Sequence, residues 1–219
     1  MTTQTLNLHR VVEQLPADSV ATLRNISWDE YQELLEQTGE ARGLRISYDD
    51  GTLHIMTTSS AHESYAWFIG SLVGIIRLRL RMNIRFFGST TMKQERRRKG
   101  LEPDACFYVQ NADLIGNRID LDFAVDPPPD IAVEIDLHHD SLSKFSIYAA
   151  LGVPEVWRYD GTQLTIHLLE QDNYSAISHS RALPMLSDQI LTGYLTRLRE
   201  EGEFQAVLAF DEWLQAQKL

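Results

Sequence analysis

The sequence predicts an α/β protein in which a mixed β-sheet is flanked by α-helices. Three observations indicate this class. Helical and strand-like segments alternate along the chain, two Asp-Gly pairs each separate two strand-like runs, and an alternating segment at 130–136 follows a proline-rich loop. The length of 219 residues and the hydrophobic fraction of 43% favour one globular core of this kind.

The N-terminal region contains the first helix. Residues 1–26 show little periodicity, so we expect an N-terminal arm followed by a single domain over 27–219. Ser27 and Glu30 fit a capping box, in which each side chain satisfies a free backbone amide at the start of a helix. We expect this helix to continue to about Gln37 and to end at Gly39.

A hairpin and a long helix are predicted next. Strand-like runs at 44–48 and 52–56 flank Asp50-Gly51, a pair that tolerates the positive φ of a tight turn. Ser60 and Glu63 fit a second capping box. Apolar side chains then recur at helical spacing, which predicts a helix with one buried face; they are Tyr65, Phe68, Ile69, Leu72 and Ile76.

The remaining elements follow from similar signals. Strands are expected at 83–87, 103–110 and 130–136, the first two separated by a basic loop. Further expected elements are a helix over 141–151 stopped by Gly152, a hairpin with strands at 156–159 and 163–168, and two amphipathic helices after Ser187.

Composition excludes several classes of protein. Cys106 is the single cysteine, so a disulfide-stapled secreted scaffold is excluded and a reducing compartment is expected. The most apolar run, 65–76, is too short to span a bilayer, and the N-terminus shows no signal-peptide pattern. We therefore expect a cytoplasmic protein with no membrane partner.

Positive charge is concentrated in one segment of an acidic chain. The formal net charge is −11, but residues 77–99 hold nine basic residues and one acid, Glu95, which leaves −19 for the rest. Clustered Lys and Arg are what phosphate binding requires. The run Arg96-Arg97-Arg98-Lys99 is therefore a candidate nucleic-acid-binding loop; the alternative is a solvated helix end followed by a charged loop.

Acidic residues interrupt strands that otherwise carry apolar side chains. Asp104 begins one of these strands, and Glu134 lies in the middle of another, where an ionised carboxylate away from water needs a partner or a metal. The alternative is that this strand face is solvated. Lys144 follows on the next helix. Two carboxylates can hold Mg²⁺ and a nearby lysine can offset developing charge, which together suit phosphodiester hydrolysis.

These residues stand in motifs that resemble a known family. The motifs are Glu102-Pro103-Asp104, Pro129-Asp130-Ile131-Ala132-Val133-Glu134-Ile135, Lys144 with Tyr148, and Gly152-Val153-Pro154-Glu155-Val156-Trp157. They resemble the bacterial Uma-type, restriction-endonuclease-like family of the PD-(D/E)XK nuclease superfamily. The resemblance covers about 27–219. It implies a restriction-endonuclease-like core, a Mg²⁺- or Mn²⁺-dependent endonuclease acting on DNA, and a homodimer, which the apolar C-terminal segment also favours.

The resemblance also implies roles for individual residues. Asp104 and Glu134 become the metal ligands. The motif lysine is displaced, because Asp136 stands where it is usual, and Lys144 takes its place. Glu63 is a candidate fourth catalytic member, although the capping box explains it equally well. Asp130 lies too far along the strand from Glu134 to share one metal.

A second function from another class stays open. The acidic remainder of the chain and Asp136 at the usual lysine position favour a non-catalytic nucleic-acid-binding or assembly module that retains the nuclease fold. The joint presence of Asp104, Glu134 and Lys144 favours the enzyme.

Overall fold

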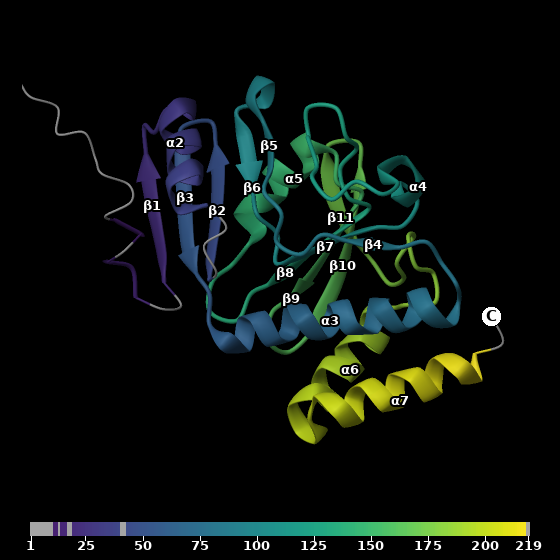
Figure 1. The fold of residues 1–219 in the computed structure, drawn as a ribbon. Coiled ribbons are helices and arrows are strands. Elements are labelled where there is room, and N and C mark those ends of the chain that lie inside the picture. Colours follow the sequence, from purple (N-terminus) through teal and green to yellow (C-terminus); the bar gives the residue numbers. More distant parts are fainter. Residues whose placement is uncertain (1–10, 13, 17–18, 40–42, 218–219) are drawn as a thin grey trace, which may run out of the picture.

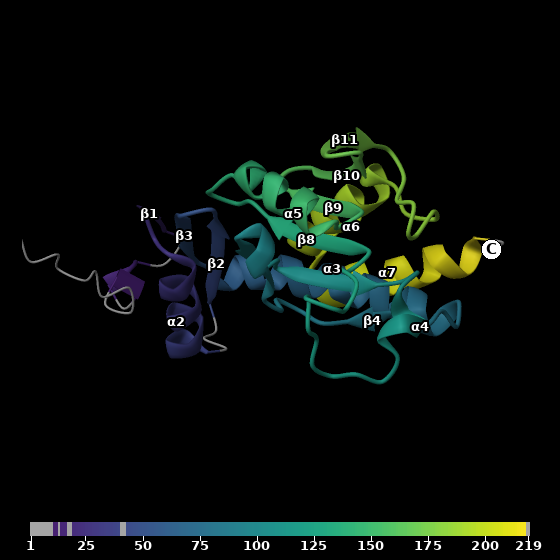
Figure 2. The same cartoon turned by 90° about the horizontal axis from the view of Figure 1, so that it is seen from above.

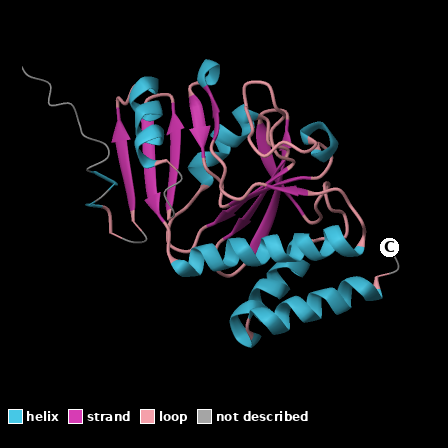
Figure 3. Ribbon diagram, viewed as in Figure 1, coloured by secondary structure: helices cyan, strands magenta, loops and turns pink. Residues whose placement is uncertain are grey.

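The computed structural model describes residues 11–12, 14–16, 19–39 and 43–217. Figure 1 shows two β-sheets side by side, with the long helix α3 (Ser60–Arg79) running beneath the second sheet. Figure 3 shows the same division by secondary structure, with helices on the outer faces of the strands. The predicted α/β class, with a mixed sheet flanked by helices, is confirmed, and the strands form two sheets.

The first sheet is antiparallel throughout and has the strand order β1-β3-β2-β6-β5. Its strands are β1 (Val20–Arg24), β2 (Leu44–Asp49), β3 (Thr52–Thr57), β5 (Met92–Gln94) and β6 (Lys99–Leu101). Strand β1 falls inside the predicted N-terminal arm and pairs with β3. Residues 1–10, 13 and 17–18 of that arm lie outside the described residues.

Helix α2 (Trp28–Thr38) covers one face of the first sheet and buries Trp28, Tyr31 and Leu34 against it. The predicted capping box is present, because the Ser27 side chain accepts from the amide of Glu30 and the Glu30 carboxylate accepts from the amide of Ser27. The predicted hairpin is confirmed as well. Its turn residues Asp50 and Gly51 both have positive φ, 38° and 95°.

The basic segment is not the loop that the sequence analysis expected. Residues Glu95–Arg97 form a 3₁₀ turn, η1, between the antiparallel strands β5 and β6. Arg98 closes this turn in the left-handed conformation, with φ 50°, and Lys99 begins β6. The four basic residues therefore sit at the tip of a short β-hairpin.

The second sheet has the order β11-β10-β9-β8-β7-β4 and is mixed, because β8 and β9 are parallel while the other pairs are antiparallel. Its strands are β4 (Arg85–Phe86), β7 (Ala105–Tyr108), β8 (Ile131–Ile135), β9 (Glu155–Tyr159), β10 (Leu164–Glu170) and β11 (Asn173–Ile177). The edge strand β11 was not predicted; its side chains are half-buried or exposed, so it lacks a strong apolar pattern.

Helices cover both faces of the second sheet (Figure 2). Helix α3 packs against Ile131, Val133 and Ile135, with α6 (Asp188–Glu201) and α7 (Glu203–Ala216) completing this core. The opposite face carries Ala132 and is covered by η2 (Leu142–Lys144) and α5 (Phe145–Leu151). A short helix, α4 (Ala112–Ile115), lies in the connection between β7 and β8.

The start of α3 differs from the predicted capping box. Ser59, not Ser60, is the N-cap, and its hydroxyl accepts from the amide of His62. Glu63 therefore does not take part in a capping box, and its carboxylate bonds to other side chains, as described below.

No helix in the described part of the chain has both the length and the hydropathy needed to cross a bilayer.

Candidate functional site

Two acidic residues lie opposite each other at the junction of β7 and β8. Asp104 directly precedes β7, and the pairing of Ala105 with Val133 places Asp104 across from Glu134. The amide of Asp104 donates to the carbonyl of Val133 over 2.9 Å, which continues the ladder by one bond. The two acids therefore lie side by side, Asp104 at the start of β7 and Glu134 within the neighbouring strand β8.

Glu134 is buried and bound at both of its carboxylate oxygens. Lys144 Nζ donates to Oε2 over 2.7 Å, and the Tyr148 hydroxyl donates to Oε1. The side chain of Glu134 is 1% exposed. Burial raises the pKa of Glu134 to about 7; the Lys144 ammonium opposes this rise and the Asp104 carboxylate adds to it.

Asp104 is equally buried, with a side chain that is 0% exposed. Its Oδ1 accepts from Arg45 Nε over 2.8 Å, and its Oδ2 accepts from the amide of Ile135 over 2.7 Å. Burial raises the pKa of Asp104, while Lys144 and Arg45 counteract that rise. His62 Nε2 lies 3.3 Å from Oδ2, but burial lowers the pKa of His62 to about 4, so its ring is neutral near pH 7.

Glu63 joins this cluster through Arg45. Arg45 Nη2 donates to Glu63 Oε1 over 2.8 Å, and the Thr58 hydroxyl donates to the same oxygen over 2.9 Å. The Arg45 side chain is 4% exposed, whereas that of Glu63 is 49% exposed. The structure thus brings together the four candidate catalytic residues, Glu63, Asp104, Glu134 and Lys144. Arg45 lies between Glu63 and Asp104 and bonds to both.

Arg45 was not identified from the sequence. It alternates in β2 with Ile46, which packs under α2, so a period of two assigns Arg45 to a solvated face. On that face Arg45 instead contacts Asp104, just before β7, and Glu63, at the start of α3. Arg45 Nη1 also donates to the carbonyl of Leu44. An arginine in a strand otherwise rich in buried side chains is the one signal that could have marked it.

Asp136, at the usual lysine position, has contacts that hold the segment after β8. Its Oδ2 accepts from the amide and the hydroxyl of Ser141, each over 2.9 Å, and from Arg158 Nε over 2.5 Å. This segment leads directly to Lys144. The sequence predicted a helix over 141–151 with Lys144 in its first turn. In the structure Lys144 is instead the last residue of the 3₁₀ turn η2, and α5 begins at Phe145.

Asp130 takes no part in the cluster. Its carboxylate accepts from the amides of Val109 and Asn111 and from the Asn111 side chain, over 2.7 to 3.0 Å. These bonds fix the position of residues 109–111, directly after β7. The inference that Asp130 does not share a site with Glu134 agrees with these contacts.

The basic hairpin lies close to the segment that carries Lys144. Lys99 forms an ion pair with Asp49, and the other oxygen of Asp49 accepts from Ser146, two residues after Lys144. Arg98 pairs with Asp50 over 2.8 Å. Arg96 and Arg97 are exposed, and no ion pair to either is seen within the described residues.

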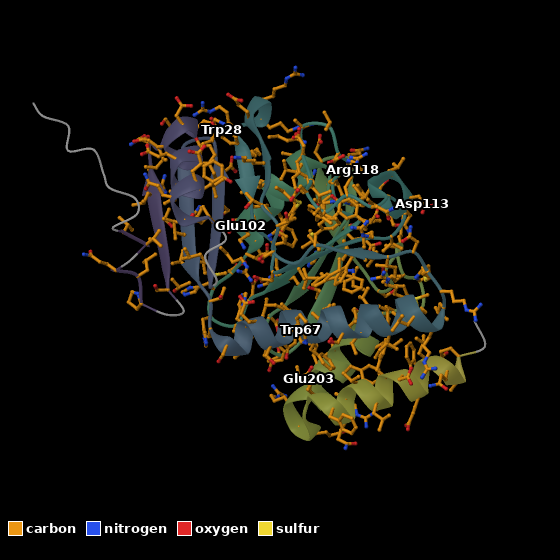
Figure 4. The ribbon with its side chains drawn as sticks, viewed as in Figure 1. Trp28, Trp67, Glu102, Asp113, Arg118 and Glu203 are labelled. Carbon is orange, nitrogen blue, oxygen red and sulfur yellow. The ribbon has the colours of Figure 1, made fainter. Side chains whose placement is uncertain are left out.

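A groove of about 890 Å³ adjoins the other side of the cluster. Its lining includes Glu63 and Trp67 from α3, Glu102, which follows β6, and Leu121. Figure 4 labels Trp67 on α3 and Glu102 beside the strands of the first sheet. Glu63 lines the groove and also contacts Arg45, so the groove borders the cluster at Glu63.

The donor set suits a hard divalent cation. In the described ranges no group of three or more His, Cys, Asp or Glu side chains is arranged to hold a metal ion. Asp104 and Glu134 together provide two adjacent carboxylates. One or two carboxylates, completed by water and substrate phosphate, are what Mg²⁺ commonly uses.

Comparisons with known proteins agree with this architecture. The model of the Uma2 family, described as "Putative restriction endonuclease", matches residues 28–197. No curated protein sequence matches the chain. Among solved structures, a "putative nuclease belonging to DUF820" from Anabaena variabilis has 15% sequence identity and a TM-score of 0.52, and the alignment covers 78% of this chain and 99% of that one. This structural similarity shows a common fold. The family match spans most of the sequence, and the chain therefore belongs to the Uma2 family.

Proposed function

We propose that the chain is a metal-dependent endonuclease that hydrolyses DNA phosphodiester bonds at Asp104, Glu134 and Lys144. The observation that carries the proposal is the buried Lys144–Glu134 ion pair beside Asp104. Buried charges are costly unless they are paired, and a buried ion pair is often no more stabilising than apolar side chains of the same size. A buried lysine beside two adjacent carboxylates therefore indicates a functional role better than a structural one. Membership of a family described as restriction endonucleases supports the same reaction.

Asp104 and Glu134 would hold Mg²⁺ or Mn²⁺ in this proposal. The ion would supply Lewis-acid polarisation of the phosphate and an acidified water. Lys144 then places a positive charge beside the phosphate oxygens, where negative charge develops during the reaction. Tyr148 holds the Glu134 carboxylate in one orientation through its hydroxyl, and Glu63 provides a further acid at the groove side.

The basic hairpin supplies the phosphate contacts in this proposal. Arg96 and Arg97 are solvent-exposed, and the pairing of Lys99 with Asp49 connects the hairpin to Ser146 near Lys144. Cations that are not already neutralised by a carboxylate contribute most to phosphate binding. We therefore assign DNA backbone contacts mainly to Arg96 and Arg97, with Arg98 and Lys99 shaping the hairpin that presents them.

Plasmid nicking in the presence of Mg²⁺ or Mn²⁺ tests the proposal. Wild-type protein is compared with Glu134→Gln, which keeps the shape of the side chain but cannot ionise. Glu203→Gln on α7 serves as a control with the same chemical change away from the cluster (Figure 4). Nicking by the wild type and the control, but not by Glu134→Gln, is expected; equal nicking by all three would mean that the activity comes from elsewhere.

One observation favours the second candidate, a non-catalytic nucleic-acid-binding or assembly module. Every carboxylate oxygen of Asp104 and Glu134 is already bonded to a donor from the chain itself. A module of this kind would bind nucleic acid without a divalent cation. Titration calorimetry with Mn²⁺ separates the two candidates, because heat of binding that disappears in Glu134→Gln is expected only of the metal-dependent enzyme.

A further inference from the structure

Arg45 occupies an unusual position for an arginine. Its guanidinium lies between two carboxylates that come from different elements, with Nε on Asp104 and Nη2 on Glu63, each over 2.8 Å. Burial alone would lower the pKa of Arg45, but the Asp104 and Glu63 carboxylates raise it overall, so the group stays charged. The chain thus places a permanent cation between two acids of its own candidate site.

Arg45 lies between an acid that lines the groove and an acid that is buried behind it. Glu63 lines the groove and is half exposed, whereas Asp104 is fully buried, and Arg45 joins the two. The second oxygen of Asp104 is held by the amide of Ile135, a backbone group that cannot leave without opening the sheet. Oδ1, the oxygen that Arg45 covers, is therefore the one that a side-chain movement can free.

The charges around Arg45 also indicate that Asp104 depends on it for neutralisation. The carboxylates of Glu63, Asp104 and Glu134 are bonded to two cations, Arg45 and Lys144, and the Glu102 carboxylate also acts on Arg45. Lys144 bonds to Glu134, so the cation that neutralises Asp104 directly is Arg45. Removing it would leave the Asp104 carboxylate without a bonded cation.

We infer that Arg45 is an internal counter-cation that competes with the divalent ion for Asp104. The ion can reach Asp104 and Glu134 only when the guanidinium leaves Asp104 Oδ1 and stays on Glu63. Glu63 then holds the Arg45 guanidinium and does not act as a third metal ligand. This inference rests on the proposed metal dependence and adds a competitor within the chain.

Calorimetric titration with Mn²⁺ tests the competition. Wild type is compared with Arg45→Met, which keeps much of the side-chain length but removes the charge, at about pH 8 so that Glu134, with a pKa of about 7, is ionised. Arg79→Met is the matched control, because Arg79 pairs with Asp211 on α7. Arg45→Met should bind Mn²⁺ about tenfold more tightly or better, while the control should equal the wild type.

The outcomes separate the inference from the proposed function. Equal or weaker Mn²⁺ binding by folded Arg45→Met would overturn the role of Arg45 and leave metal dependence intact. Absence of Mn²⁺ binding in wild type and in both variants would overturn the metal dependence, and the inference with it.

A second measurement uses the wild-type protein and does not depend on whether Arg45→Met folds. Phenylglyoxal modifies accessible arginines, and peptide mass spectrometry reports the modification of Arg45 itself. With a side chain that is 4% exposed, Arg45 should react slowly without metal and several-fold faster when Mn²⁺ is bound. A rate that Mn²⁺ leaves unchanged or lowers would show that the guanidinium stays on Asp104, and would overturn the inference.

Discussion

Lys144 Nζ donates a hydrogen bond of 2.7 Å to Oε2 of Glu134, although the two residues lie on opposite sides of the turn that follows β8. Asp136 holds that turn through Ser141. Position 136, two residues after the acid, holds an aspartate, and Glu134 is bonded instead to a lysine ten residues further along the chain. The bonds of Asp136 to Ser141 and Arg158 fix the path of the segment that leads to Lys144.

Lys144→Met should lower DNA cleavage by about 10²-fold or more, the scale of losing one electrostatic stabiliser of the transition state. Lys93→Met in β5 is the control, since it removes the same charge outside the cluster. Rates of supercoiled plasmid nicking with Mg²⁺ give the comparison, and circular dichroism reports whether each variant is folded. Cleavage that survives in Lys144→Met would show that Lys144 is not the catalytic lysine.

The contribution of Glu134 to the stability of the metal-free protein should fall as pH rises from about 4.5 to about 7. Burial raises the pKa of Glu134 from 4.5 to about 7, so the folded protein holds this proton more tightly than the unfolded chain does. The stabilisation is therefore complete below the unfolded pKa and is lost as pH rises through the folded one. The difference between the two pKa values corresponds to a free energy of about 3 kcal/mol.

Glu134→Gln isolates this effect because its amide does not titrate. Urea unfolding of wild type and Glu134→Gln across this pH range should give curves that diverge, with the variant gaining relative stability as pH rises. Asp104, whose pKa is also raised by burial, acts on Glu134, so the difference between the two curves reports the titration of Glu134 together with its effect on Asp104. Parallel curves would mean that Glu134 titrates in the folded state near its ordinary value.

Local signals predicted much of the fold. The Ser27–Glu30 capping box, the Asp50-Gly51 turn and Gly152 at the end of α5 each act within a few residues, and each is found where it was expected. The Ser60–Glu63 pattern was wrong by one residue, because Ser59 competes for the same role and sequence alone does not rank two adjacent serines.

Non-local contacts could not be predicted in the same way. Arg45 meets Asp104 across 59 residues of sequence and Glu63 across 18, and only the packing of the second sheet against the first brings them together. Asp104, Glu134 and Lys144 were identified through motifs and a family resemblance. Their mutual contacts depend on strand register and on the turn held by Asp136, which composition and periodicity do not reveal.

Replacing both Arg96 and Arg97 by glutamine should reduce the salt dependence of DNA binding. Each phosphate that is no longer neutralised lowers the slope of log K against log salt by roughly 0.9, so the slope for the double variant should fall by up to about 1.8. Fluorescence anisotropy with labelled duplex DNA at several salt concentrations measures the slope. Arg197→Gln with Arg199→Gln, on α6, removes the same charge elsewhere and should leave the slope unchanged; equal reductions in both double variants would indicate a diffuse charge effect.

The C-terminal helices are expected to support a homodimer. A groove of about 470 Å³ between α3 and α7 is bordered by the exposed side chains of Leu78, Phe204 and Leu208. Exposed apolar patches of this kind mark interfaces, and two-fold pairing is the commonest form of assembly. Sedimentation equilibrium should give twice 25.1 kDa for wild type and a smaller mass for Phe204→Ser. A mass of 25.1 kDa for the wild type at all micromolar concentrations would contradict the dimer.

Ser59→Ala and Ser60→Ala should differ in stability although the two substitutions are chemically identical. Ser59 is the N-cap of α3 and its hydroxyl accepts from the amide of His62, so its removal should cost about 0.5–1 kcal/mol. Ser60 lies inside the helix, where alanine is a better helix former, and its replacement should be neutral or slightly stabilising. Urea unfolding of the two variants decides between the caps. A larger destabilisation for Ser60→Ala would restore Glu63 to a capping box, and would weaken the case that Glu63 is free to hold Arg45.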